Sequence, residues 1–162
     1  NRLLRCVFVC GQTLFAASQF PNLQQVLSDI EVAIELIDQG KGADAEKVLA
    51  TFVLPQTREW GNNFSEKGSG FIKVLIGQEP EIYKMTPAEI EELWHHGQYF
   101  AQHPELGLDF GDFESSHFQK WNNIYDAILH PVTAIVDIRV GALDAAKNEL
   151  SEVLAHISSL EE

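Results

Sequence analysis

The stretch "LQQVLSDIEVAIELIDQGKG", residues 23–42, decides the fold class. Its apolar side chains recur at helical spacing and form one stripe: Leu23, Val26, Leu27, Ile30, Ile34 and Ile37. Acidic residues lie off this stripe, and Gly40-Lys41-Gly42 follows it with residues suited to a helix C-cap. The stretch therefore predicts an amphipathic helix that ends near Gly40 and packs against other helices.

The next segments contain one helix and one ambiguous run. A second helix is predicted from about Ala43, and we expect Pro55 to kink it or end it. The run "FIKVLIG", residues 71–77, fits either a short buried strand or an apolar turn of helix. The run "RCVFVCG", residues 5–11, has the same pattern, so the two could pair as strands. Such a pair is marginal unless helices pack on it.

The C-terminal half predicts three more helices. One begins at "TPAE", residues 86–89, which has the form of a capping box, and runs to about Gln102. The next spans about 113–129, and His130-Pro131 is expected to separate it from a last helix that reaches about Leu160. The sequence thus predicts an all-α bundle of about five helices, with at most a minor pair of short strands.

We expect one domain, in which residues 21–160 form the bundle and residues 1–20 form an apolar N-terminal segment. Arginines, an apolar run and small residues in this segment resemble a secretory signal peptide. The run is too short and too interrupted to predict a transmembrane helix. Three interpretations stay open: a core element, which we favour, an uncleaved export signal, or an arm that contacts a membrane complex or a partner. Export or an organelle lumen therefore stays open as the compartment.

The chain is strongly acidic, with 24 Asp and Glu against 11 Lys and Arg among 162 residues and a net charge of −13. Such a surface repels phosphate backbones, so nucleic acid is excluded as an expected partner. A protein with a basic surface is the expected partner instead, although solubility alone explains the charge equally well.

The stretch "DFGDFESSHF", residues 109–118, is the candidate for metal chemistry. Its possible ligands are three carboxylates and one imidazole: Asp109, Asp112, Glu114 and His117. Together they could bind a hard cation or Zn²⁺ at one end of the bundle. The alternative, which we favour, is that Asp112 caps the helix, Glu114 interacts with its dipole and His117 lies at the core margin.

Arg139 is the most unusual single residue, because it falls at the centre of the apolar stripe of the predicted last helix. A guanidinium there needs a partner, since an unpaired buried charge is costly. One interpretation is that Arg139 binds a ligand carboxylate or an acid of a partner protein. The favoured interpretation is an internal ion pair, or stacking on Trp121 or Tyr125.

These observations favour a non-enzymatic, acidic helical interaction protein, such as an accessory or regulatory subunit that binds another protein. No cofactor is expected for it. The alternative function is a metal-binding bundle or a metal-dependent hydrolase that uses Asp112, Glu114 and His117.

Overall fold

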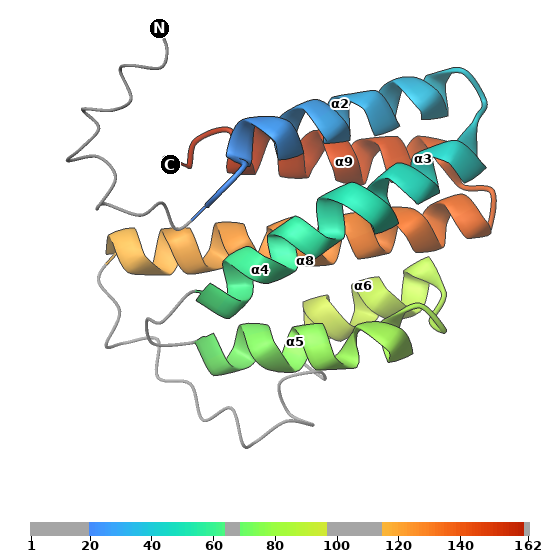
Figure 1. Ribbon diagram of the computed structural model, residues 1–162. Helices are drawn as coiled ribbons and strands as arrows, with labels where there is room; N and C mark the ends of the chain where they lie inside the picture. Colours follow the sequence, from blue (N-terminus) through green and yellow to red (C-terminus); the bar gives the residue numbers. More distant parts are fainter. Residues whose placement is uncertain (1–19, 64–68, 97–114, 161–162) are drawn as a thin grey trace, which may run out of the picture.

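The computed structural model describes residues 20–63, 69–96 and 115–160, which are mostly helical (Figure 1). No strand occurs in these ranges, and the predicted all-α fold is confirmed. The run at 71–77 lies inside helix α5 (Ser69–Ile82), so its interpretation as a strand is wrong.

Helix α2 (Leu23–Asp38) is the amphipathic helix that the opening stretch predicts. Its buried face consists of Leu23, Val26, Ile30, Ala33 and Ile37. The helix ends as expected, because Gly40 adopts a φ of 76°, a left-handed conformation that glycine tolerates without strain. Helix α3 (Gly42–Val48) follows this turn at once.

The chain does not break at Pro55. Helix α3 continues through a π-helical segment (Leu49–Val53) into α4 (Leu54–Asn63). A proline ring clashes with the carbonyl four residues earlier in a regular helix. For Pro55 that carbonyl belongs to Thr51, which lies within the π-helical segment. A π-helix is wider than an α-helix, so the segment lies where the ring of Pro55 would clash in a regular helix.

Helix α6 (Pro87–His96) begins with the predicted capping box. The Thr86 N–H donates to Glu89 Oε1 at 2.8 Å, and the Glu89 N–H donates to Thr86 Oγ1 at 3.1 Å. A backbone N–H at the start of a helix has no carbonyl of a preceding turn to donate to. The two side chains supply acceptors for the N–H groups of Thr86 and Glu89 instead.

The predicted break at His130-Pro131 is wrong. Helix α8 (Ser115–Arg139) runs through Pro131, which is buried, and the chain turns instead at Gly141, whose φ is 82°. Helix α9 (Leu143–Ile157) then returns along α8. The apolar stripe of the predicted last helix therefore belongs to two helices.

Helix α8 lies centrally, packed against α9, α3, α4 and α5, and α2 packs on α3 and α9 (Figure 1). The largest fully buried side chains are Trp60, Phe20, Leu23, Ile30, Leu49, Leu54, Ile124 and Ile128. Trp60 also donates its indole N–H to the Pro21 carbonyl at 2.8 Å, which ties α4 to the start of α2. The pairing of α8 with α9 positions the polar cluster described next.

Candidate metal centre

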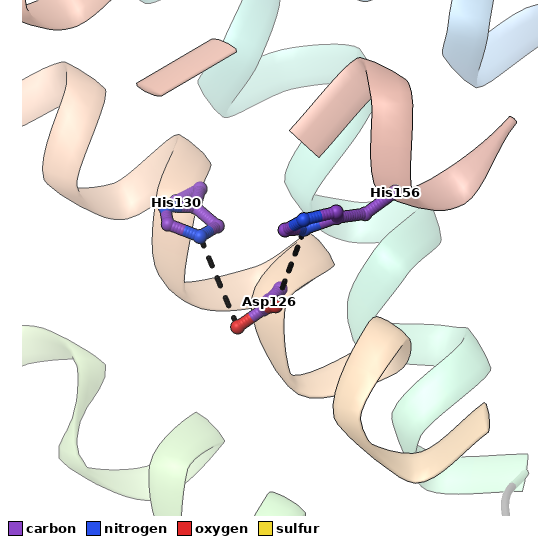
Figure 2. A group of neighbouring side chains, drawn as sticks. All are labelled: Asp126, His130 and His156. Carbon is purple, nitrogen blue, oxygen red and sulfur yellow. Dashed lines mark ion pairs between the residues drawn. The ribbon is translucent and has the colours of Figure 1, made fainter. Parts of the chain in front are cut away.

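The candidate centre is a group of imidazoles and carboxylates on α8 and α9. Helix α8 places Asp126 and His130 one turn apart, because four residues separate them. Helix α9 contributes three side chains at helical spacing: Glu149, Glu152 and His156. Figure 2 shows Asp126 with ion pairs to both imidazole rings.

The atoms that could bind a metal lie close together. Asp126 Oδ2 is 3.3 Å from His156 Nδ1, and Asp126 Oδ1 is 3.8 Å from His130 Nε2. Glu152 Oε1 is 4.0 Å from the same His130 nitrogen. In a tetrahedral zinc site with bonds of about 2.0–2.1 Å, neighbouring ligand atoms are roughly 3.3 Å apart. The observed separations therefore need only small side-chain movements to enclose an ion.

His130 uses its two ring nitrogens differently. Its Nδ1 lies 2.5 Å from Glu149 Oε1, and because an ionised carboxylate only accepts, Nδ1 donates the proton. Its Nε2 faces the carboxylates of Asp126 and Glu152. These groups are acceptors, so the space between them and Nε2 favours a positive species, either a proton on the ring or a metal ion.

The electrostatics also favour a cation. Burial raises the pKa of Asp126, and the neighbouring His130 and His156 oppose this effect without cancelling it. Burial lowers the pKa of His130, but the hydrogen bond with Glu149 and the surrounding carboxylates outweigh it, so the pKa is raised overall. With neutral imidazoles, the five side chains carry three negative charges. A divalent cation would offset most of them.

The donor types indicate which ion fits. Two imidazole nitrogens with carboxylate oxygens suit Zn²⁺ and neighbouring transition metals, whereas Ca²⁺ and Mg²⁺ prefer ligand sets made of oxygen. Glu149 contacts Nδ1 of His130, the ring nitrogen that faces away from the other carboxylates, and so orients the ring. His156 is 44% exposed and Glu152 is 65% exposed, so an ion can reach the cluster from solvent.

The metal ligands predicted from the sequence are not those of this centre. Asp109, Asp112 and Glu114 lie outside the described residues. His117 lies in the first turn of α8, but its side chain is also outside the description. The predicted cluster stays a prediction, as does the cap at Asp112. His130 is about 20 Å further along the helix axis than His117.

Arg139 is the last residue of α8 and its side chain is 49% exposed, so its predicted place inside an apolar stripe is wrong. Its Nη2 lies 2.9 Å from Glu46 Oε2 on α3. Its guanidinium carbon is 5.1 Å from the ring centroid of Tyr83, which takes the role expected of Trp121 or Tyr125. Both contacts lie within the chain, while a role in binding a ligand stays a prediction.

A second polar group joins α4 to α5, and its members satisfy one another. Glu79 is 4% exposed and accepts hydrogen bonds from two of the three guanidinium nitrogens of Arg58, Nε and Nη2. The Tyr83 hydroxyl donates to Glu79 Oε2 at 2.5 Å. Burial and this hydrogen bond raise the pKa of Tyr83. The Glu79 carboxylate is thus paired with donors of this chain, and we interpret the group as one that stabilises the contact between α4 and α5.

Sequence reasoning missed the centre at His130, although the sequence contains a signal for it. Asp126 and His130 are four residues apart, and so are Glu152 and His156. Each spacing puts a carboxylate and an imidazole on one helix face. The signal was lost because a break was predicted at His130-Pro131, which removed His130 from the helix that carries Asp126.

No protein-family model, curated protein or solved structure matches this chain. Among the described helices, none combines the length and apolar character that crossing a membrane requires.

Proposed function

We propose that the protein binds one divalent transition-metal ion between α8 and α9. Zn²⁺ is the ion that we take for the tests below. The ligands are His130, His156 and Asp126, each of which offers one donor atom within 4.8 Å of the others. Glu152, 4.0 Å from His130 Nε2, completes the set. Glu149 holds the His130 ring in orientation from the opposite side.

The observation that carries this proposal is the arrangement around His130. Its Nδ1–H is bonded to one carboxylate while its Nε2 faces two more, with a second imidazole beside them. A protonated histidine has two N–H donors, so Glu149 and one further carboxylate already satisfy it. The additional carboxylate adds repulsion, and a bound cation removes that repulsion.

The direct test is zinc titration of chelator-treated full-length chain by isothermal calorimetry. The wild-type chain should bind one equivalent. His130→Gln should abolish stoichiometric binding, because it removes the nitrogen that faces both carboxylates. Glu149→Gln should keep the ligands but weaken binding by about 10–100-fold, as loss of an orienting carboxylate typically does.

His117→Gln is the matched control, since it removes an imidazole from the same helix and tests the cluster predicted from the sequence. It should bind zinc like the wild type. The proposal is wrong if the wild type binds no equivalent of metal, or if His117→Gln loses binding while His130→Gln keeps it. Circular dichroism of each variant separates loss of the site from loss of the fold.

The acidic surface supports a second proposal, that the protein binds a partner protein through basic residues of that partner. Helix α2 contains four carboxylates and no basic residue: Asp29, Glu31, Glu35 and Asp38. The apolar Val32 on the same helix is 46% exposed. Attraction of this kind is screened within about 8–10 Å at ordinary ionic strength. A partner that co-purifies with the wild-type protein should therefore be released as the salt concentration rises. The double variant Glu31→Lys/Glu35→Lys should bind it more weakly already at low salt. Retention of the partner at high salt by the wild type and by the double variant would contradict this proposal.

A further inference from the structure

Two hairpins of the bundle share one construction. The α2–α3 hairpin turns at Gly40 with a φ of 76°, and the α8–α9 hairpin turns at Gly141 with a φ of 82°. In both turns the residue after the glycine donates its N–H to the carbonyl five residues earlier, at 2.8 Å. These bonds run from Lys41 to Leu36 and from Ala142 to Asp137. Both turns are therefore Schellman motifs of the same form.

The sequences of the two hairpins correspond at an offset of 101 residues, from Gly40 to Gly141. Identical residues occupy several equivalent positions: Ala33 and Ala134, Ile34 and Ile135, Ile37 and Ile138, Ala45 and Ala146, Leu49 and Leu150. Four of the five buried positions of α2 coincide with buried positions of α8: Leu23 and Ile124, Val26 and Ala127, Ile30 and Pro131, Ala33 and Ala134. Helix α8 is buried at nearly every position from 123 to 137, so burial does not set the offset here. The agreement therefore rests on identical residues and on turn geometry.

The second helices of the hairpins agree as well, once the π-helical segment is taken into account. After this segment the offset becomes 100 residues, because the segment absorbs one extra residue. The buried positions then match again: Val53 and Val153, Thr57 and Ile157, Trp60 and Leu160. The simplest account is a duplicated helical hairpin with a one-residue insertion in its first copy.

The two hairpins pack against each other in a reciprocal way. Helix α2 contacts α9, the second helix of the other hairpin, and α3 contacts α8, the first helix of the other hairpin. Both turns lie at the same end of the bundle (Figure 1). There a Cβ atom built on Gly42 would be 3.2 Å from Ile138 Cγ2 and 3.2 Å from Leu143 Cδ2. This is the packing of an approximate two-fold pair.

Two ion pairs join the hairpins at this end. Their four residues stand at two pairs of equivalent positions, and the charge at each position of the first hairpin is opposite to that in the second. Lys147 Nζ lies 2.7 Å from Asp38 Oδ1, and Arg139 Nη2 lies 2.9 Å from Glu46 Oε2. At the offset of 101 residues, Asp38 corresponds to Arg139 and Glu46 corresponds to Lys147. The acids thus belong to the first hairpin and the bases to the second.

We propose that these swapped charges make each hairpin an interaction surface for the unlike hairpin only. Two first hairpins from separate chains would place Asp38 against Glu46, and two second hairpins would place Arg139 against Lys147. Both arrangements bring like charges together, while the unlike pairing makes two ion pairs. The partner that fits either surface is the opposite hairpin, which the same chain supplies.

Exchanging charges within the full chain tests this proposal without altering composition or net charge. Glu46→Lys/Lys147→Glu makes each hairpin complementary to itself and turns both intrachain pairs into repulsions. Asp38→Arg/Arg139→Asp does the same from the other side of each pair. All four substitutions together restore both intrachain pairs with reversed polarity.

We expect each double variant to have a Tm lower by about 2–6 °C, because exposed pairs are individually weak and four charges change partners. Sedimentation after refolding should detect a dimer in Glu46→Lys/Lys147→Glu that increases with protein concentration and decreases with salt. The quadruple variant should regain most of the stability that Asp38→Arg/Arg139→Asp loses, and should match the wild type in oligomeric state.

Three results would overturn the proposal. The double variants could match the wild type in Tm and oligomeric state, or the quadruple variant could be as unstable as Asp38→Arg/Arg139→Asp. A lower Tm with no change in oligomeric state would also contradict it, since the pairs would then stabilise the bundle without selecting the partner.

Discussion

His130 shows how one residue sets the properties of the whole centre. Its side chain is 19% exposed, and its ring contacts carboxylates through both nitrogens. The bond to Glu149 fixes which nitrogen carries the proton, and the remaining nitrogen is then directed at Asp126 and Glu152. Orientation of the ring, more than the mere presence of imidazole, makes the cluster suitable for a metal.

Asp137, also on α8, gives a prediction about pH. It is 2% exposed, and burial together with the charge of Glu149 raises its pKa to about 6. The folded state therefore binds the proton more tightly than the unfolded chain, whose carboxyl titrates near 3.8. Stability from this group is fully present below about pH 4 and is lost as the pH rises through about 6.

Asp137→Asn should consequently stabilise the protein at pH 7, by about 1–3 kcal/mol, because the amide never acquires the buried charge. Urea unfolding at pH 7 and pH 4 measures this difference. The gain should shrink toward zero at pH 4. An equal effect at both pH values would show that the carboxylate charge is not its cause.

At the scale of elements, Gly141 decides where α8 ends. Its φ of 82° costs a residue with a side chain roughly 1 kcal/mol, because Cβ crowds the backbone in the left-handed region. Gly141→Ala should therefore lower the free energy of unfolding by about 1 kcal/mol, measured by urea denaturation.

Gly77→Ala is the matched control, since Gly77 lies inside α5 with no atom within 4 Å of a Cβ built on it. There alanine should stabilise the helix by up to about 1 kcal/mol, because it restricts the unfolded chain more than glycine does. Equal effects of the two substitutions would contradict the assigned role of the turn.

Helix boundaries were predictable where local chemistry alone determines them. Gly40 ends α2 and the box at Thr86 starts α6 as predicted, because each signal involves only neighbouring residues. The prolines misled the prediction, because tertiary packing offsets their local cost. Pro131 is buried within α8, which packs on α3, α4, α5 and α9, and Pro55 follows the π-helical segment. With a helix break predicted at His130-Pro131, the apolar residues after it fitted one continuous helix, and the turn at Gly141 was therefore not predicted.

At the scale of the whole molecule, the candidate centre could not be predicted because it depends on how α8 and α9 meet. The pairs Asp126/His130 and Glu152/His156 are visible as spacings, but only the turn at Gly141 brings them together. Arg139 was the residue in the sequence that indicated a helix end at this point. A cation at the centre of an apolar stripe is improbable inside one helix but ordinary at the end of a helix, where its charge complements the dipole.

The candidate ligands of the second hairpin have no equivalents in the first. At the equivalent positions, the first hairpin has Gln25 for Asp126, Asp29 for His130 and Val48 for Glu149. Shared packing thus does not require the ligand residues. They are confined to the second hairpin.

X-ray absorption at the zinc edge of the full chain, loaded with one equivalent of zinc, tests the central claim most directly. The account predicts nitrogen and oxygen ligands at about 2.0–2.1 Å, with outer-shell scattering from two imidazole rings. His156→Gln should reduce this scattering to that of one ring. A hydrated ion surrounded by oxygens alone, or imidazole scattering that His130→Gln and His156→Gln both leave unchanged, would contradict a metal centre between α8 and α9.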